Sequence, residues 1–299
     1  AGPGGMFQPL ADGLKMFLKE EIIPSQSSPV LFILGPSLAL FTALLGSAVI
    51  PFGQSIQIGD RLVPLQVTDI NVGILYIFGI VSLGVYGIMI GGWASNNKYS
   101  LMGAIRAASQ NISYEIAMGL SLIALLMVTN TLSLGEIASQ QHGWQWNIIY
   151  QPLGFIIFLI CAFAECNRTP FDLPESENEL VGGYHTEYSG FKLGAFLFAG
   201  YVNMFISSAV MATLYFGGYN YPGMDTVNSL LGPTLGPLVG VLVLFAKVLF
   251  FIFLFMWVRW TIPRFRYDQL MNLGWKVLIP LAIANIVITG IVITVIEKL

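Results

Sequence analysis

Charged residues are scarce in this sequence of 299 residues. Only 10% are Asp, Glu, Lys or Arg, whereas 56% are hydrophobic and the mean hydropathy is +0.75. A soluble globular domain carries about 25% charged residues, so the composition excludes that class and indicates a chain solvated mainly by lipid. The net charge of −3 and the lack of a basic tail also argue against binding to nucleic-acid phosphates.

Ligands for metals and redox groups are few as well. The two cysteines, Cys161 and Cys166, lie five positions apart at the end of one apolar run, which fits neither a C-x-x-C site nor a disulfide framework. Both histidines, His142 and His185, lie in polar connections, so they do not form a pair of axial haem ligands inside a membrane. We therefore expect no metal site and no cofactor bound by this chain alone.

Long apolar runs are abundant. A hydrocarbon core of about 30 Å needs roughly 20 apolar residues of helix to cross it. Windows of that kind predict seven membrane-spanning helices, near residues 29–52, 70–93, 114–133, 148–166, 191–216, 236–258 and 274–296. The predicted fold is an all-α polytopic membrane protein, in which residues 1–299 form a single transmembrane domain.

The segment before the first run has a helical pattern of its own. Its apolar residues are Phe7, Leu10, Leu14, Phe17 and Leu18, and its polar residues include Gln8, Asp12, Lys15 and Lys19. This spacing predicts an amphipathic helix over residues 6–20, lying in the membrane interface. Asp12 has small neighbours, Ala11 and Gly13, so its carboxylate could instead line a cleft.

Basic residues gather on one side of the predicted membrane. That side holds the N-terminal segment and the loops 94–113, 167–190 and 259–273, with Lys15, Lys19, Lys98, Arg106, Arg168, Lys192, Arg259, Arg264, Arg266 and Lys276. The other side has Arg61 and Lys298. Because basic loops stay on the cytoplasmic side, we expect these three loops to face the cytoplasm, or the matrix in a mitochondrion.

Acidic residues are dense on the same side, above all in the predicted acidic loop 164–190. Its carboxylates are Glu165, Asp172, Glu175, Glu177, Glu179 and Glu187. Carboxylates this close repel one another when ionised, so some of them can hold and pass protons near neutral pH. The alternative is a solvated acidic loop with ordinary pKa values, and composition alone does not decide between the two.

Three ionisable residues lie in or at the edge of apolar runs, where a charge is costly and usually functional. Glu165 directly follows the apolar run 155–164, so it lies at a helix C-terminus, where the helix dipole disfavours an anion. Glu115 lies near the start of another apolar stretch, which begins at Ile112. We interpret these two acids as the membrane ends of a wet acidic cavity. Lys247, near the middle of its span, is either a charge element of a proton route or a lysine paired with carbonyl groups.

Five stretches spread along nearly the whole chain share one resemblance. They are residues 2–15, 92–101, 106–115, 164–190 and 263–271. The fourth contains Arg-Thr-Pro-Phe-Asp-Leu-Pro-Glu at 168–175, and the fifth is Pro-Arg-Phe-Arg-Tyr-Asp-Gln-Leu-Met. Together they resemble the H-type membrane subunits of bacterial respiratory complex I, the counterparts of mitochondrial subunit 1.

The resemblance implies a membrane subunit of proton-pumping NADH:quinone oxidoreductase, a translocase of the respiratory chain. Such a subunit forms the membrane part of the quinone-binding chamber and couples quinone reduction to proton translocation. Quinone is the implied substrate, whereas FMN and iron–sulfur clusters are expected in partner subunits. The implied partners are the peripheral-arm subunits, including the one with the terminal iron–sulfur cluster, the adjacent proton-pumping membrane subunits and membrane lipids. The bacterial plasma (inner) membrane is favoured over the mitochondrial inner membrane.

The resemblance also implies roles for individual residues. The acids that match a proton relay leading away from the quinone chamber are Glu115, Glu165, Glu175, Glu177, Glu179 and Glu187. Arg168 and Asp172 match residues of the same charged loop, and Gln8 and Asp12 match the quinone path. Family members normally have eight spans, so we expect that a first helix is missing from this sequence, although a genuine seven-helix variant remains an alternative.

Two other functions compete with this interpretation. The anchor subunit of a membrane-bound hydrogenase shares the Pro-Phe-Asp loop at 170–172, but the stretches around Asp12 and at 263–271 favour complex I. A stand-alone ion transporter would need a binding site near the midplane, often within internal repeats and broken helices. The sequence shows no such repeat, and its acids lie at one face.

Overall fold

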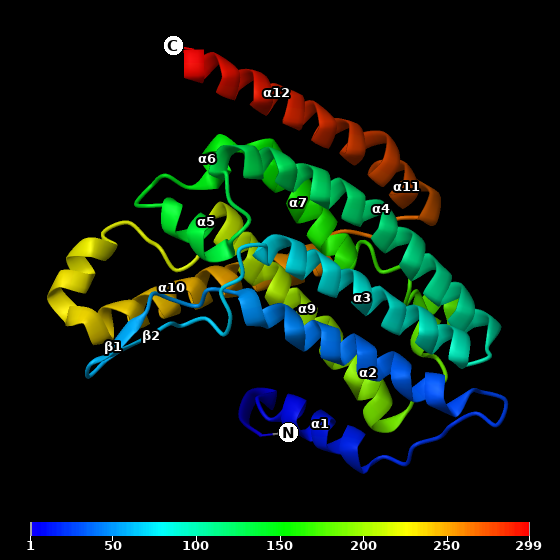
Figure 1. The fold of residues 1–299 in the computed structure, drawn as a ribbon. Coiled ribbons are helices and arrows are strands. Elements are labelled where there is room, and N and C mark those ends of the chain that lie inside the picture. Colours follow the sequence, from blue (N-terminus) through cyan, green and yellow to red (C-terminus); the bar gives the residue numbers. More distant parts are fainter. Residues whose placement is uncertain (1, 299) are drawn as a thin grey trace. The chain divides into compact units, whose positions relative to one another are not determined.

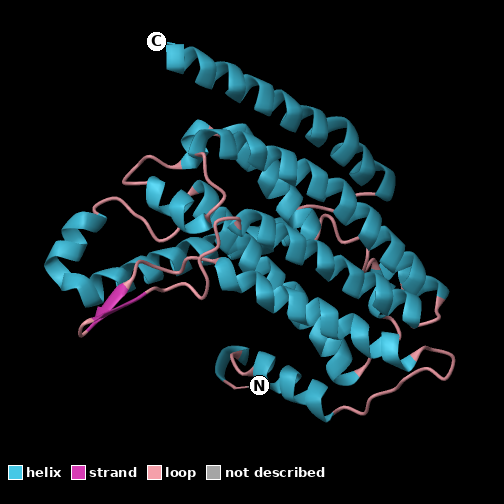
Figure 2. Cartoon of the chain, in the orientation of Figure 1, coloured by secondary structure: helices cyan, strands magenta, loops and turns pink. Residues whose placement is uncertain are grey.

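A computed structural model describes residues 2–298, apart from the side chains of Ile58, Glu177, Asn178, Pro233 and Glu297. Most of the chain is helical, with one short β-hairpin among the described residues (Figure 2). The elements are η1 (Pro3–Gly5), α1 (Gln8–Leu18), α2 (Pro29–Gly46), η2 (Ser47–Val49), β1 (Ile56–Ile58), β2 (Arg61–Val63), α3 (Gly73–Ala94), α4 (Lys98–Thr129), α5 (Leu134–Gln140), α6 (Asn147–Tyr150), α7 (Pro152–Glu165), α8 (Glu177–Leu180), η3 (Gly183–His185), α9 (Gly190–Tyr215), α10 (Met224–Thr261), α11 (Tyr267–Asn272), the π-helical η4 (Leu273–Leu278) and α12 (Ile279–Lys298).

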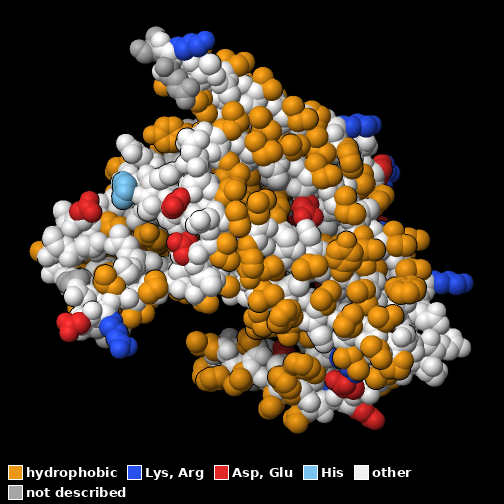
Figure 3. All heavy atoms as spheres, in the orientation of Figure 1, with side chains coloured by type: hydrophobic (Ala, Val, Ile, Leu, Met, Phe, Trp, Pro, Cys, Tyr) orange, Lys and Arg blue, Asp and Glu red, His pale blue; other side chains and the backbone are white. Residues whose placement is uncertain are grey.

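Six helical segments in the described part of the chain are long and apolar enough to cross a membrane. They are Pro29–Val49, Gly73–Ala94, Lys98–Thr129, Gly190–Tyr215, Thr234–Thr261 and Tyr267–Ile296. Many of their large hydrophobic side chains are exposed, and hydrophobic atoms cover much of the face drawn in Figure 3. The chain is therefore a multi-pass helical membrane protein. Near residues 148–166 the structure has α7, of 14 residues, so a seventh crossing there stays a prediction.

Two of the predicted loops are mostly helix. The loop expected at 94–113 is wrong for most of its length, because α4 begins at Lys98. Ala104, Ala107 and Ala108 are buried on this helix, so small side chains rather than large apolar ones pack its first turns. The loop expected at 259–273 shrinks to the residues between Thr261 and Tyr267. The first turns of α4 also bury polar side chains, such as Ser100 and Gln110, which lower the mean hydropathy of this segment below that of an apolar run.

The chain divides into two compact units that are interleaved in the sequence. Unit 1 comprises Ala1–Leu45, Ile80–Asn111 and Asp172–Asn203. Unit 2 comprises Gly46–Gly79, Ile112–Phe171 and Met204–Leu299. Each unit collects segments that are far apart in the sequence, so the tertiary structure decides which ionisable residues become neighbours.

In unit 1, α2 packs side by side with the second part of α3 (Figure 1). A Cβ atom on Gly35 would lie 2.7 Å from the Cα atom of Gly91, and one on Gly87 would lie 2.8 Å from the backbone nitrogen of Ala39. Small residues allow this backbone contact, which is the usual way that helices associate where lipid provides no hydrophobic drive.

In unit 2, a polar clamp holds α12. The side-chain amide of Gln151, just before α7, donates to the hydroxyl of Thr289 at 2.8 Å and accepts from the amide of Asn285 at 2.9 Å. All three side chains are buried. Because α12 is otherwise apolar and largely exposed, this pair of hydrogen bonds fixes its position and rotation.

Candidate functional site

The acidic residues of unit 2 lie on two helices. Glu115 is in α4, and Glu165 is the last residue of α7. Both are partly buried, and the two carboxylates lie near enough to repel each other electrostatically. The structure thus brings together two acids that stand at the ends of separate apolar runs in the sequence.

Tyr114 holds this part of α4 in place. Its side chain is buried, its hydroxyl donates to the backbone carbonyl of Leu270 at 3.0 Å, and its ring meets Phe171 edge to face with centroids 5.4 Å apart. Phe265 extends the contact, because its backbone N–H donates to the carbonyl of Pro170 at 3.1 Å. The 263–271 stretch therefore packs beside the residue that precedes Glu115.

Arg168 is the cation of the acidic loop that belongs to unit 2. It is partly buried, and its carbonyl accepts from the backbone N–H of Phe171 at 2.8 Å. Asn167 precedes it with a φ of 50°, in the left-handed region that Asn tolerates better than most residues. This turn directs the chain away from the end of α7.

The remaining described acids of the loop belong to unit 1, and three of them have polar partners there. Glu179 pairs with Arg106 at 2.5 Å, Glu187 accepts from the amide of Asn97 at 2.5 Å, and Glu175 accepts from the hydroxyl of Tyr184 at 3.3 Å. No spacing in the sequence indicates these partners, although Asn97 and Arg106 lie in the stretches that carry the family resemblance.

Two further residues of the loop complete the predicted set. Asp172 is buried at 8% exposure, at the start of its segment of unit 1. The side chain of Glu177 lies outside the described residues. Its role in a relay stays a prediction.

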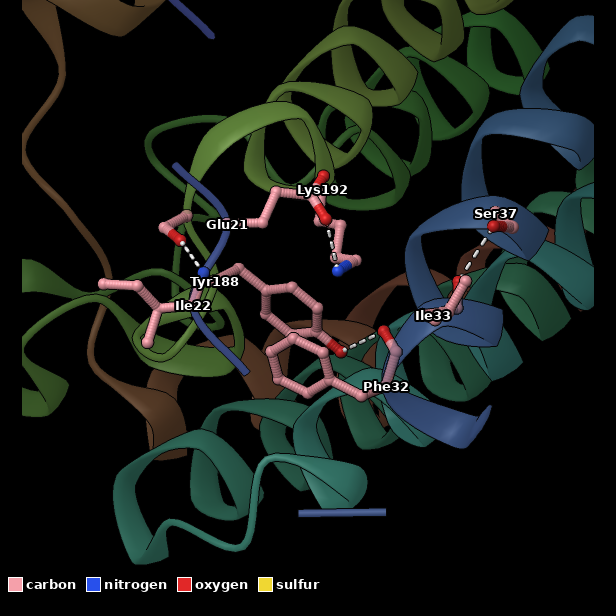
Figure 4. Close-up of polar contacts among 8 residues, drawn as sticks. Glu21, Ile22, Phe32, Ile33, Ser37, Tyr188 and Lys192 are labelled. Carbon is pink, nitrogen blue, oxygen red and sulfur yellow. Dashed lines mark hydrogen bonds and ion pairs between the residues drawn. The ribbon is translucent and has the colours of Figure 1, made fainter. Parts of the chain in front are cut away.

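The segment that follows Glu187 is anchored to α2 and to the chain before it (Figure 4). The ring of Tyr188 stacks on Phe32 with centroids 4.1 Å apart, and its hydroxyl is 3.1 Å from the Phe32 carbonyl oxygen and 3.2 Å from that of Gly91. Burial raises the pKa of Tyr188, so its phenol stays neutral and remains a donor. Lys192 pairs with Glu21 at 2.7 Å rather than with an acid of the loop.

The two residues predicted for the quinone path are adjacent on α1. The amide of Gln8 donates to the carboxylate of Asp12 at 3.1 Å, one turn along the helix, and both side chains are exposed. Further along α1, Phe17 stacks on Phe191 of α9 with centroids 4.8 Å apart. The position of this helix at a membrane surface stays a prediction.

A polar pocket of about 430 Å³ opens beside Glu187. It is lined by residues 24–26, 95–99 and 187. Lys98 and Tyr99 give it one cationic and one aromatic group, both exposed. Among the residues that the structure describes, His, Cys, Asp and Glu side chains nowhere gather in threes as metal ligands would.

Comparisons with known proteins agree with one another. Residues 1–290 match a family described as NADH dehydrogenase. The chain is 68% identical over 290 residues to the NADH-quinone oxidoreductase H-type subunit 1 of Cytophaga hutchinsonii, covering 97% of this chain and 84% of the relative. It is 64% identical over 293 residues to the H-type subunit of Flavobacterium johnsoniae, with 98% and 84% covered, and 48% identical over 301 residues to the H-type subunit 1 of Geobacter sulfurreducens, with 97% and 83% covered.

Proposed function

The chain belongs to the NADH dehydrogenase family, and from that premise we propose that it is the H-type membrane subunit of a proton-pumping NADH-quinone oxidoreductase. In this proposal it forms the membrane part of the quinone-binding chamber and couples quinone reduction to proton translocation through a carboxylate relay. The observation that carries the proposal is the electrostatic proximity of Glu115, on α4, to Glu165, at the end of α7. The relatives, which are named as H-type subunits of NADH-quinone oxidoreductase, support the assignment to that complex.

A like-charged pair is suited to moving protons. Two neighbouring carboxylates in a poorly solvated place cannot both ionise cheaply, so they share protons and respond to a change of charge nearby. Reduction of a quinone to a neutral quinol takes up two electrons and two protons. If both protons are drawn from groups that line the chamber, those groups are left with two more negative charges. In our proposal that change shifts the protonation of the Glu115 and Glu165 pair and biases a conformational or hydration switch in the next subunit.

The other predicted residues have supporting roles in this mechanism. Glu175, Glu177, Glu179 and Glu187, with Arg168 and Asp172, carry the change of charge from the chamber to that pair. Partners such as Arg106 and Asn97 allow the loop acids to exchange one hydrogen bond for another as they take up or release protons. Gln8 and Asp12, already hydrogen-bonded to each other, present a polar edge to the quinone on its path.

We further propose that α7 makes the seventh crossing. A 14-residue helix rises about 21 Å, less than a hydrocarbon core of about 30 Å. Backbone that is not helical is tolerated at membrane depth where protein surrounds it. Half of the residues of α7 are buried, and α6 and the buried Gln151 precede it directly, which supports a crossing enclosed by protein. The basic loops then face the cytoplasm of a bacterial plasma membrane.

The proposed relay is tested in the assembled complex in membrane vesicles. Glu165→Gln keeps the shape of the side chain but removes its ability to ionise. We expect NADH-driven quinone reduction and proton uptake to fall at least tenfold, while the amount of assembled complex is unchanged. Glu136→Gln is the matched control, because Glu136 is exposed at the start of α5 and bonds to Thr131. Normal reduction and pumping rates in Glu165→Gln would overturn the relay.

A further inference from the structure

Lys247 is an ionisable residue within an apolar helix of unit 2, and the proposed relay does not use it. It lies on α10 among apolar residues from Leu244 to Phe250. Its ammonium donates three hydrogen bonds to backbone carbonyl oxygens: to Phe216 at 2.7 Å, to Gly218 at 2.8 Å and to Asn220 at 2.6 Å. An ammonium has three N–H donors, so all of them are used.

The three oxygens converge because of how α9 ends. Tyr215 is the last helical residue, and Gly217 and Gly218 follow with φ values of 75° and 55°. Glycine adopts this left-handed backbone conformation without steric cost. The N–H of Gly218 donates to the carbonyl of Ala212 at 2.8 Å and so closes the end of the helix. The turn points every second carbonyl, at positions 216, 218 and 220, toward one place. A helix C-terminus already carries partial negative charge, so the place attracts a cation.

The surroundings make this oxygen cage a closed site. The backbone from Gly217 to Asn220 is buried, and the Asn220 side chain is tied to the carbonyl of Ala138 at 2.5 Å. The ammonium also lies 5.3 Å from the ring centroid of Trp146, over its face. Carbonyl oxygens and an aromatic face are both groups that hold cations where water is scarce.

We infer that residues 216–220 and Trp146 form a binding site for a small monovalent primary ammonium, and that the Lys247 side chain is its tethered occupant. The three carbonyl oxygens accept hydrogen bonds and cannot donate them, so the site matches an occupant with three N–H groups, as an ammonium has. In this role Lys247 completes the end of α9 and is not a carrier in a proton route. The inference does not depend on the relay proposed above.

The test empties the site and refills it with a free ligand. In the assembled complex, Lys247→Ala leaves three buried acceptors without a donor, so we expect a lower midpoint for thermal loss of NADH:quinone reductase activity. Methylammonium chloride should raise that midpoint in a saturable way in Lys247→Ala. The wild type should not respond, because the site is occupied. Lys276→Ala, which removes an exposed lysine, is the matched control and should show neither effect.

The chemistry of the ligand separates the possible results. Tetramethylammonium has the same charge but no N–H donors and is larger, so it should not stabilise Lys247→Ala. Sodium or potassium chloride should act less than methylammonium at equal ionic strength. An equal response to all these salts, or no response to methylammonium, would overturn the site. Glu165→Gln should not respond to methylammonium, so failure of the relay and failure of this site are distinguishable.

A variant that fails to assemble still gives an answer. Cells expressing Lys247→Ala are then grown with and without methylammonium, and assembled complex is measured on native gels stained for NADH dehydrogenase activity. Recovery of assembly with methylammonium supports the site, and equal absence of complex in both cultures contradicts it. Trp146→Leu, which keeps Lys247 and removes only the aromatic face, should lower the thermal midpoint by less than Lys247→Ala.

Discussion

Lys247 and Glu165 both belong to apolar helices of unit 2, yet their neighbours are of opposite kinds. Three fixed carbonyl oxygens, 2.6–2.8 Å away, surround the ammonium of Lys247. The carboxylate of Glu165 instead has another carboxylate, that of Glu115, as its electrostatic neighbour. The ammonium has three acceptors for its three N–H groups, whereas the Glu165 carboxylate has a neighbour of like charge. In our two proposals, the neighbours of an ionisable residue, more than its burial, distinguish a structural charge from a relay group.

The loop acids of unit 1 form an intermediate case. Glu179 has an ion pair, and Glu175 and Glu187 each have a neutral donor. These contacts are partly exposed and each is a single hydrogen bond, so each contributes little to stability and can be exchanged for another partner.

Reversing the charge of Lys247 should have the largest effect. Lys247→Glu would place a carboxylate among three carbonyl oxygens and over an aromatic face, which costs several kcal/mol unless the site opens. We expect assembled complex to be absent from membranes, as measured on native gels. Arg259→Glu is the control, because Arg259 is exposed at the end of α10 and should still allow assembly. Normal amounts of assembled Lys247→Glu complex would show that the three carbonyl oxygens do not require a cation, so that Lys247 and Glu165 would no longer differ in the way proposed.

Neutralising both relay acids should show that they act as one unit. Glu115→Gln and Glu165→Gln should each lower proton pumping at least tenfold, and the double variant should be no slower than the slower single variant. The measurement is the initial rate of NADH-driven acidification of inverted vesicles, corrected for the amount of complex. If the two losses multiply in the double variant, the acids work independently and the shared-proton mechanism is wrong.

Breaking the polar clamp of α12 tests a neutral network in the same unit. Gln151→Leu leaves Asn285 and Thr289 buried without their partner, which should cost about 1–3 kcal/mol and lower the thermal midpoint of the complex. Thr294→Ala is the control on the same helix, since Thr294 is exposed and donates to the carbonyl of Gly290 within α12. Equal midpoints for Gln151→Leu and the wild type would show that apolar contacts alone hold α12.

The exposed ion pair should matter least for stability. Arg106→Gln removes the partner of Glu179, whose side chain is 54% exposed, so the expected loss is under about 1 kcal/mol. Pumping should fall by a smaller factor than in Glu165→Gln, because the loop acid keeps access to water. A loss of pumping as large as that of Glu165→Gln would place Arg106 and Glu179 in the centre of the relay.

Most of the helices can be predicted from composition alone. Runs of apolar residues at 29–52, 70–93 and 191–216 correspond closely to α2, α3 and α9, because a helix in lipid needs only length and apolarity. The long first half of α4 escapes prediction, since its packing uses alanines and polar residues that a search for apolar windows passes over. The hairpin of β1 and β2 escapes it too, because three-residue strands leave almost no pattern.

By itself, the sequence determined that this is a helical membrane protein, and its motifs identified the family. It also predicts, from the distribution of Lys and Arg, which loops face the cytoplasm. These properties follow from residue type and order, because apolar length decides which segments enter lipid and the distribution of Lys and Arg decides their orientation. Only the tertiary structure decided that Glu115 and Glu165 are neighbours, that Arg106 meets Glu179, and that Lys247 reaches three carbonyls at the end of α9. Each of these depends on contacts between segments 27 to 73 residues apart, and the packing of helices sets such contacts where no sequence spacing can.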